Sequence, residues 1–150
     1  MNNLKRRVAT MQSLLASSVV SGTTSYPKIR VELTEAENVQ TVSKEKRRHL
    51  LQILHLTRAL DSTLAEFTDY YDCKGQKPTL GAYLRNLTNH CSPLINKLPE
   101  ASRKRYQKAI VDKRNNYMHN AGEFPANSHE ITVLLQEMST CMAEVLALKV

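Results

Sequence analysis

The feature that most constrains the fold is a long helical repeat of apolar residues between positions 43 and 71. The repeat consists of leucines followed by two aromatic residues: Leu50, Leu54, Leu60, Leu64, Phe67 and Tyr71. Side chains at such spacings share one face of an α-helix, because each residue advances the helix by about 100°. The pattern therefore predicts one helix of about 28 residues.

The rest of the chain adds shorter amphipathic segments separated by turn residues. Helices are expected over residues 4–20, 79–90 and about 99–118, with a short helical segment over 92–98. A last helix is expected to start at Asn127 or Ser128, after the stop signals Gly122 and Pro125. Only four glycines and five prolines are present, too few for a turn-rich β domain. The predicted fold class is an all-α, antiparallel bundle of four to six helices.

The first third of the chain is the least regular. Residues 28–33, KIRVEL, alternate apolar and charged side chains and fit a short extended piece, whereas 34–37, TEAE, has the form of a capping box. Residues 1–31 contain no acid and loosely resemble a targeting peptide, but polar residues interrupt the apolar run, so a native first helix is favoured. We expect residues 1–42 to form an N-terminal helix and linker, within or beside a bundle made by residues 43–150.

Composition points to an anionic partner and a reducing compartment. The net charge is +7, from 21 Lys and Arg against 14 Asp and Glu, which favours nucleic acid first and an acidic protein or lipid surface second. Cys73, Cys91 and Cys141 form no CxxC pair and are odd in number, so a disulfide framework or zinc site is disfavoured. No apolar stretch approaches the ~20 residues of a membrane span. The expectation is a cytoplasmic protein without a membrane segment.

The segment KRNNYMHN, residues 113–120, gathers residue types that handle phosphates and protons. Asn115 and His119 are four residues apart and share a helical face, whereas Arg114 and His119 diverge by roughly 140° on a regular helix. Two things can bring them together: the length of the arginine side chain, or unwinding of the helix toward Gly122. The helix dipole favours a charged His119 and the basic residues beside it oppose this, so titration near neutrality is expected.

The run RNNYMH resembles the motif of the HEPN superfamily of all-α ribonucleases. That motif is an Arg, four to six residues and a His, often with Asn directly after the Arg, placed before the final helix. The segment KPTLGAYLRNL, residues 77–87, is also similar to a Leu-Gly helix of several HEPN branches. The motif covers six residues, and the helical layout extends the resemblance over about residues 43–148.

The resemblance implies a metal-independent endoribonuclease that needs no cofactor and acts as a homodimer, with two motifs meeting in a basic cleft. His119 would deprotonate the RNA 2′-hydroxyl or protonate the leaving 5′ oxygen, Arg114 would hold the phosphate, and Asn115 would orient the phosphate or the histidine. The product would carry a 2′,3′-cyclic phosphate. A toxin or phage-defence role, with an antitoxin or other protein partner, also follows from the resemblance alone.

One position departs from the family pattern. HEPN toxins paired with nucleotidyltransferase antitoxins usually carry Tyr two residues after the His, where this chain has Ala121. Regulation by modification of that tyrosine is therefore in doubt. Tyr117 is a distant substitute, and both Tyr117 and Asp112 are candidates for supporting the site.

A basic run precedes the motif and is a candidate footprint for the RNA backbone. It contains six cations within residues 103–114, of which five are expected to bind RNA: Arg103, Lys104, Arg105, Lys108 and Lys113. The same residues also fit a solvated helix face. Likewise, Arg114 and His119 fit a helix C-terminus carrying ordinary basic residues. The alternative function is a non-catalytic bundle that binds RNA or serves as an immunity or adaptor subunit.

Overall fold

The chain forms an all-helical bundle, as its periodicity predicts. The computed structural model describes residues 3–125 and 127–148, and no strand occurs among them. If the unbroken run of α5, the π-helical segment η3 and α6 is counted once, the described chain has six helices. The helices are α1 (Asn3–Ala16), α2 (Tyr26–Asn38), α3 (Glu45–Tyr70), α4 (Leu80–Asn89), α5 (Glu100–Tyr106), η3 (Gln107–Asp112), α6 (Lys113–His119) and α7 (Ser128–Leu146).

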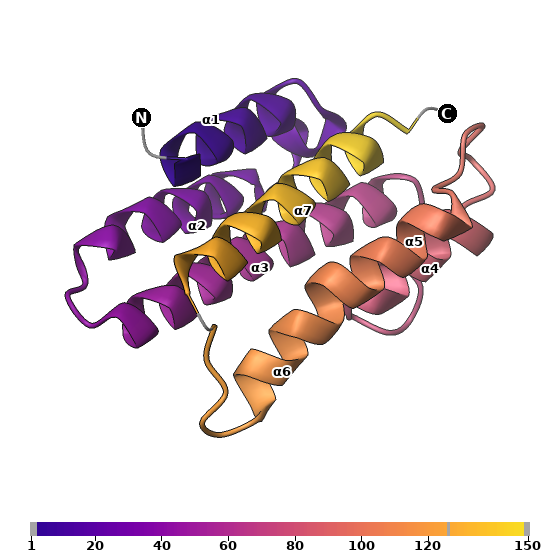
Figure 1. Ribbon diagram of the computed structural model, residues 1–150. Coiled ribbons are helices and arrows are strands. Elements are labelled where there is room, and N and C mark those ends of the chain that lie inside the picture. Colours follow the sequence, from indigo (N-terminus) through magenta and orange to yellow (C-terminus); the bar gives the residue numbers. More distant parts are fainter. Residues whose placement is uncertain (1–2, 126, 149–150) are drawn as a thin grey trace.

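The long helix α3 is the centre of the bundle. Helices α2, α7 and α4 pack directly on it, and α1 packs on α7 and α2 (Figure 1). Leu60 and Leu64 on α3 are at most 1% exposed. Burial of a leucine contributes about 1.5–3 kcal/mol, so the apolar stripe is a main source of stability. The α5–α6 helix runs along one side of the bundle, before the loop that leads into α7 (Figure 1).

The first forty residues share the core of the bundle. Helix α1 buries Leu4, Val8, Met11 and Leu15, and α2 buries Ile29, Leu33 and Ala36, all within one apolar cluster with α3 and α7. Two 3₁₀ turns, η1 (Val19–Gly22) and η2 (Val39–Thr41), connect these helices. The sequence predicts an N-terminal segment over residues 1–42 and a bundle over residues 43–150. Residues 1–2 of the first and 149–150 of the second lie outside the described residues.

Two local predictions are wrong. Residues 28–33 are not extended but belong to α2, because Ile29, Leu33 and Ala36 follow a helical spacing and Val31 is 59% exposed. TEAE therefore lies inside a helix rather than starting one. Residues 92–98 form turns instead of a helix; the backbone N–H of Leu98 donates to the carbonyl of Leu87 (3.1 Å) and ties this loop to α4.

The cysteine prediction is also wrong, because Cys73 and Cys91 form a disulfide. The loop after α3 folds back along α4, so that the two Cα atoms lie 5.1 Å apart. Asn86 supports this path by donating to the Lys74 carbonyl (2.9 Å). Disulfides persist in oxidising compartments, so the cysteines no longer favour a cytoplasmic location. Only Cys141 is a buried free thiol, in line with the role of a small apolar side chain.

The other predicted helices are present, although α1 ends at Ala16 rather than at residue 20. Thr79 caps α4 by accepting from the N–H of Ala82 (3.3 Å), and Asn127 caps α7 by accepting from Glu130 (3.2 Å). Within the described ranges, no helix is both long enough and apolar enough to span a bilayer.

Candidate functional site

Three residues of the 114–119 segment, Arg114, Asn115 and His119, line one pocket. Helix α6 stays regular up to His119, and the backbone becomes extended only at Asn120. Unwinding therefore does not bring Arg114 and His119 together. Both side chains nevertheless line the same pocket as Asn115, and Arg114 donates to the Asn115 side-chain oxygen (3.1 Å). The two side chains are therefore related by lining one pocket, while the hydrogen bond of Arg114 is to Asn115.

The pocket lies between three parts of the fold and encloses about 440 Å³. One wall comes from the middle of α3, another from the start of α4, and the third from the helix that carries the motif. Its lining residues are Thr57, Arg58, Asp61, Pro78, Thr79, Leu80, Gly81, Arg85, Gln107, Val111, Arg114, Asn115 and His119. The volume is in the range of small-molecule sites.

A π-helical segment shapes the wall that leads to the motif. Gln107 and Asp112 are five residues apart, one turn of a π-helix, and the Gln107 amide donates to the Asp112 carboxylate (2.9 Å). Asp112 itself is exposed and does not line the pocket. Its link to the pocket is therefore the hydrogen bond from Gln107. The π-helical turn precedes Arg114 directly, and π-helical turns are frequent at functional sites.

Three arginines give the pocket its positive charge. Arg58 forms an ion pair with Glu32 on α2 (2.9 Å). Arg85 and Arg114 have no acidic partner within 4.0 Å among the described residues. Guanidinium groups bind phosphate oxygens through bidentate hydrogen bonds. Arginines without an acidic partner in a concave site therefore favour a phosphate ligand.

The first turn of α4 adds to this preference. Leu80 and Gly81 line the pocket where α4 begins, and the N-terminal end of a helix carries a partial positive charge. The Thr79 hydroxyl satisfies the N–H of Ala82, which fixes the helix start against the pocket. The predicted Leu-Gly segment is thus part of the pocket wall.

Asp61 is the acidic residue among the lining side chains. Its Oδ1 atom is buried and has no hydrogen-bond partner in the described structure. Burial raises the pKa of the carboxyl above its ordinary value, while the positive charge of Arg114 opposes the increase. Burial also raises the pKa of Tyr83 on α4, with a further contribution from the charge of Asp61.

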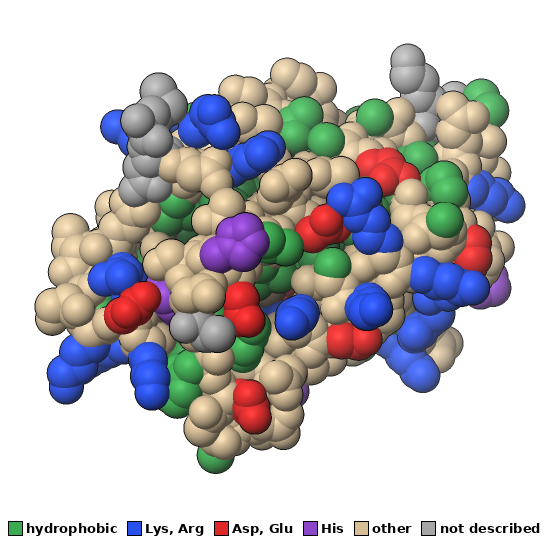
Figure 2. Space-filling model, viewed as in Figure 1, with side chains coloured by type: hydrophobic (Ala, Val, Ile, Leu, Met, Phe, Trp, Pro, Cys, Tyr) green, Lys and Arg blue, Asp and Glu red, His purple; other side chains and the backbone are tan. Residues whose placement is uncertain are grey.

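The cations of the basic run, residues 103–113, do not line the pocket. Arg103 is paired with Glu100, and Arg105 makes two hydrogen bonds to Glu137 (2.7 and 2.8 Å). Lys and Arg side chains lie along this helix with acidic side chains between them (Figure 2). Within this run, the exposed lysines with no ion pair in the described structure are Lys104, Lys108 and Lys113.

Tyr117 faces a different neighbour. Its hydroxyl donates to the Glu130 carboxylate on α7 (2.7 Å). Burial raises the pKa of Tyr117 to about 12, and the hydrogen bond to Glu130 adds to the shift. Tyr117 lines a small hollow with Lys113 and His129 on the α7 side. It therefore has no contact with the pocket that contains His119.

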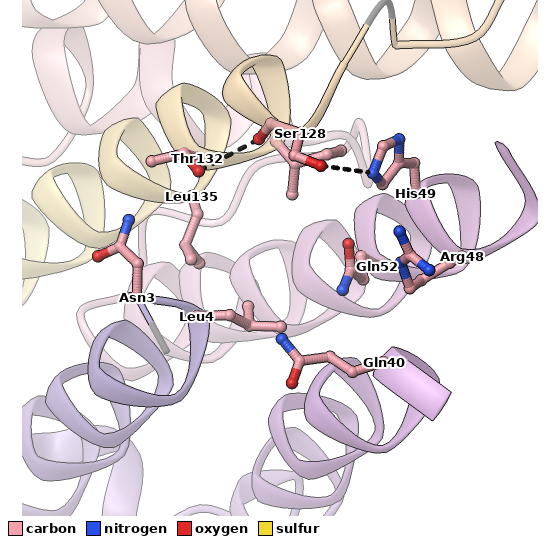
Figure 3. A pocket seen from close by; sticks show the side chains of 10 residues that line it. Asn3, Leu4, Gln40, Arg48, His49, Gln52, Ser128, Thr132 and Leu135 are labelled. Atoms are coloured by element: carbon pink, nitrogen blue, oxygen red, sulfur yellow. Dashed lines mark hydrogen bonds between the residues drawn. The ribbon is translucent and has the colours of Figure 1, made fainter. Parts of the chain in front are cut away.

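A second pocket of about 380 Å³ lies between α1, α3 and α7 (Figure 3). Its buried His49 has Nε2 at 3.4 Å from the Ser128 hydroxyl and 3.8 Å from the Glu45 carboxylate. In a catalytic triad, the serine and the acid contact opposite ring nitrogens of the histidine. Here Ser128 and Glu45 both lie nearest to Nε2 of His49, so this arrangement is not a catalytic triad. Burial lowers the pKa of His49. Arg48, the cation lining this pocket, donates to the Val42 carbonyl (3.2 Å).

Sequence reasoning missed Arg58, Asp61 and Arg85. Arg85 had a detectable signal, because it follows Gly81 by four residues within the segment that resembles a HEPN helix. Arg58 and Asp61 lie in the middle of the long helix, where single charged residues look like ordinary solvated positions. Only the packing of α4 and α6 over this part of α3 distinguishes them.

Comparisons with known proteins add no family assignment. Protein-family models, curated proteins and solved structures were all compared with this chain, and none matched. The HEPN resemblance therefore stays a prediction from the sequence. Among the described residues, no group of three or more His, Cys, Asp and Glu side chains could hold a metal ion. The functional inference rests on the residues that line the pocket.

Proposed function

We propose that the pocket around Arg114 binds the phosphodiester backbone of RNA and cleaves it without a metal ion, leaving a 2′,3′-cyclic phosphate. The observation that carries this proposal is the shared pocket of Arg114, Asn115 and His119, which also contains Arg58 and Arg85. Guanidinium groups supply phosphate binding, and the imidazole supplies a group that can accept and donate a proton.

The chemistry follows from these roles. His119 removes the proton of the 2′-hydroxyl, the 2′ oxygen attacks phosphorus, and the bond to the 5′ oxygen breaks. Arg114 stabilises the charge that develops on the phosphate; one such donor typically contributes about 2.7–4 kcal/mol. The leaving 5′ oxygen takes up a proton, which His119 of a second copy would supply in the homodimer that the resemblance implies.

The charge of the chain supports RNA as the ligand. The net charge of +7 favours a polyanion, and the exposed Lys104, Lys108 and Lys113 precede the motif along the same α5–α6 run. None of these lysines lines the pocket, so an RNA strand bound there would contact them only outside the pocket. Their contribution is therefore to affinity and association rate rather than to catalysis.

The test is cleavage of labelled RNA in the presence of EDTA. We expect the wild-type protein to produce 2′,3′-cyclic phosphate ends and His119→Ala to lose cleavage while retaining RNA binding. His129→Ala is the matched control, because His129 is an exposed histidine on α7 outside the pocket. Equal cleavage by wild type and His119→Ala would overturn the proposal.

A second candidate is a module that binds RNA without cutting it. It is favoured by the single imidazole in the pocket of one chain, since the two proton transfers are usually divided between two groups. In that case RNA binding would depend on Arg85 and Arg114, and no cyclic ends would form. A cytoplasmic toxin or defence role, and an antitoxin or other protein partner, remain proposals based on the resemblance.

A further inference from the structure

Asp61 is a negative charge placed where a phosphate must bind. It lies in the middle of α3 and lines the pocket with Arg114, the residue proposed to hold the phosphate. Its Oδ1 atom is buried without a hydrogen bond, so the protein does little to stabilise the ionised carboxylate except through nearby positive charge. A carboxylate with one oxygen buried and without a hydrogen bond is a poor neighbour for an anionic ligand.

The groups around Asp61 can be named element by element. Arg58 is on the same helix, Tyr83 and Arg85 are on α4, and Arg114 and His119 are on α6. Tyr83 is buried and neutral, because burial raises its pKa. In the free protein, Arg114 is the cation whose charge acts on Asp61.

Phosphate binding changes this balance. A phosphodiester that engages Arg114 neutralises the charge that stabilised the Asp61 carboxylate and brings a second negative charge into the pocket. Two like charges in a desolvated site do not both stay ionised, so one of them takes up a proton. The phosphodiester is too acidic to do so near neutral pH, which leaves the carboxyl of Asp61.

We propose that phosphate binding to this pocket is coupled to proton uptake by Asp61. The inference rests on the proposed function only in requiring that the pocket binds a phosphodiester; it does not require cleavage. Affinity should fall as the pH rises through the range in which Asp61 is ionised in the free protein. For one coupled proton, the decrease is at most about tenfold per pH unit.

The experiment measures proton uptake during binding of a short oligodeoxynucleotide. DNA lacks the 2′-hydroxyl, so it cannot be cleaved by the proposed mechanism, and its phosphodiesters do not titrate near neutral pH. Calorimetric titrations in two buffers of different ionisation enthalpy, repeated over a range of pH, count the protons taken up. Four proteins are compared: wild type, Asp61→Asn, Asp69→Asn and His119→Gln.

Each variant has a defined expectation. Asp61→Asn should lose the proton uptake assigned to the carboxyl and bind more tightly than wild type at the high end of the pH range. Asp69→Asn makes the same charge change at an exposed site of α3 and should behave like wild type. His119→Gln should retain the uptake that depends on Asp61, which separates it from protonation of the imidazole. Equal uptake by wild type and Asp61→Asn would overturn the inference.

Two further measurements keep the result unambiguous. Carbon-detected NMR of the Asp61 carboxyl in the wild-type protein should show a higher pKa with the oligonucleotide than without it, and an unchanged pKa would also overturn the inference. RNA cleavage is assayed in parallel. Coupled binding without RNA cleavage would refute the nuclease and leave the inference intact, whereas His119-dependent cleavage with uncoupled binding would do the reverse.

Discussion

The side-chain oxygen of Gln107 lies 2.9 Å from the point that a β-carbon on Gly81 would occupy. This close approach joins the start of α4 to the π-helical turn that precedes Arg114, and both residues line the proposed RNA pocket. Glycine is therefore favoured at position 81 because Gln107 lies so close, and not because the backbone adopts a conformation that requires glycine.

Replacing Gly81 by Ala should displace the Gln107 side chain and break its hydrogen bond to Asp112. Because Ala is favoured over Gly inside a helix by about 1 kcal/mol, the net change in unfolding free energy should be small. RNA affinity should fall several-fold, measured by filter binding. Gly22→Ala is the matched control, since no atom lies within 4 Å of its added β-carbon. Equal RNA affinity for both variants would contradict the role of this contact.

Arg85 and Arg105 provide a test of which cations bind the RNA backbone. Arg85 lines the pocket without an ion pair, whereas Arg105 is bound to Glu137 outside it. Arg85→Ala should reduce the slope of log affinity against log salt concentration by about one, because one phosphate contact is lost. Arg105→Ala should change the slope less. The reverse order would place the RNA on the outer face of α5.

Burial of His49 predicts an acid-sensitive fold. Burial lowers the pKa of His49 below that of the unfolded chain, while Glu45 opposes the shift. Its contribution to stability is therefore fully present above the unfolded pKa of about 6.5 and is lost as the pH falls through the folded pKa. Between pH 7.5 and 4.5, the free energy of unfolding measured in urea should decrease less for His49→Gln than for wild type. His90→Gln, an exposed control, should lose as much stability as wild type.

The Cys73–Cys91 disulfide should stabilise the α4 wall of the pocket. The two cysteines are 18 residues apart in sequence. For a loop of this length, the reduced entropy of the unfolded chain predicts a stabilisation of about 3 kcal/mol. Addition of reductant should lower the unfolding free energy by about this amount in wild type and have no effect in a Cys73→Ala/Cys91→Ala variant. Thiol labelling of the denatured, non-reduced protein should find one free thiol, Cys141. Three labelled thiols would mean that the disulfide does not form.

Sequence periodicity was sufficient for most of the helices. The apolar stripe of α3 and the capping residues Thr79 and Asn127 are local signals, and the structure agrees with them. The segment 28–33 was misread because it is short enough for its alternating charges to mimic a strand. Its helical spacing becomes evident only when Ala36 is included.

The lining of the candidate site could be predicted only where it is contiguous in sequence. Arg114, Asn115 and His119 belong to one segment, so the motif selects all three as candidates, and they line one pocket. Arg58, Asp61 and Arg85 enter the pocket through the packing of α3 against α4 and α6, which no local pattern encodes. The disulfide was missed for the same reason, since a loop reversal brings its cysteines together. The π-helical turn has no simple sequence signature.

The central claim is that Arg114 and His119 act together on a ribose–phosphate linkage. The most direct test compares an RNA strand with its fully 2′-O-methylated counterpart in EDTA, followed by analysis of the ends formed. Both strands should bind, only the unmodified RNA should be cut, and its new ends should be 2′,3′-cyclic phosphates that are absent with His119→Ala. Cleavage of the methylated strand, or products ending in a 3′-hydroxyl, would contradict it.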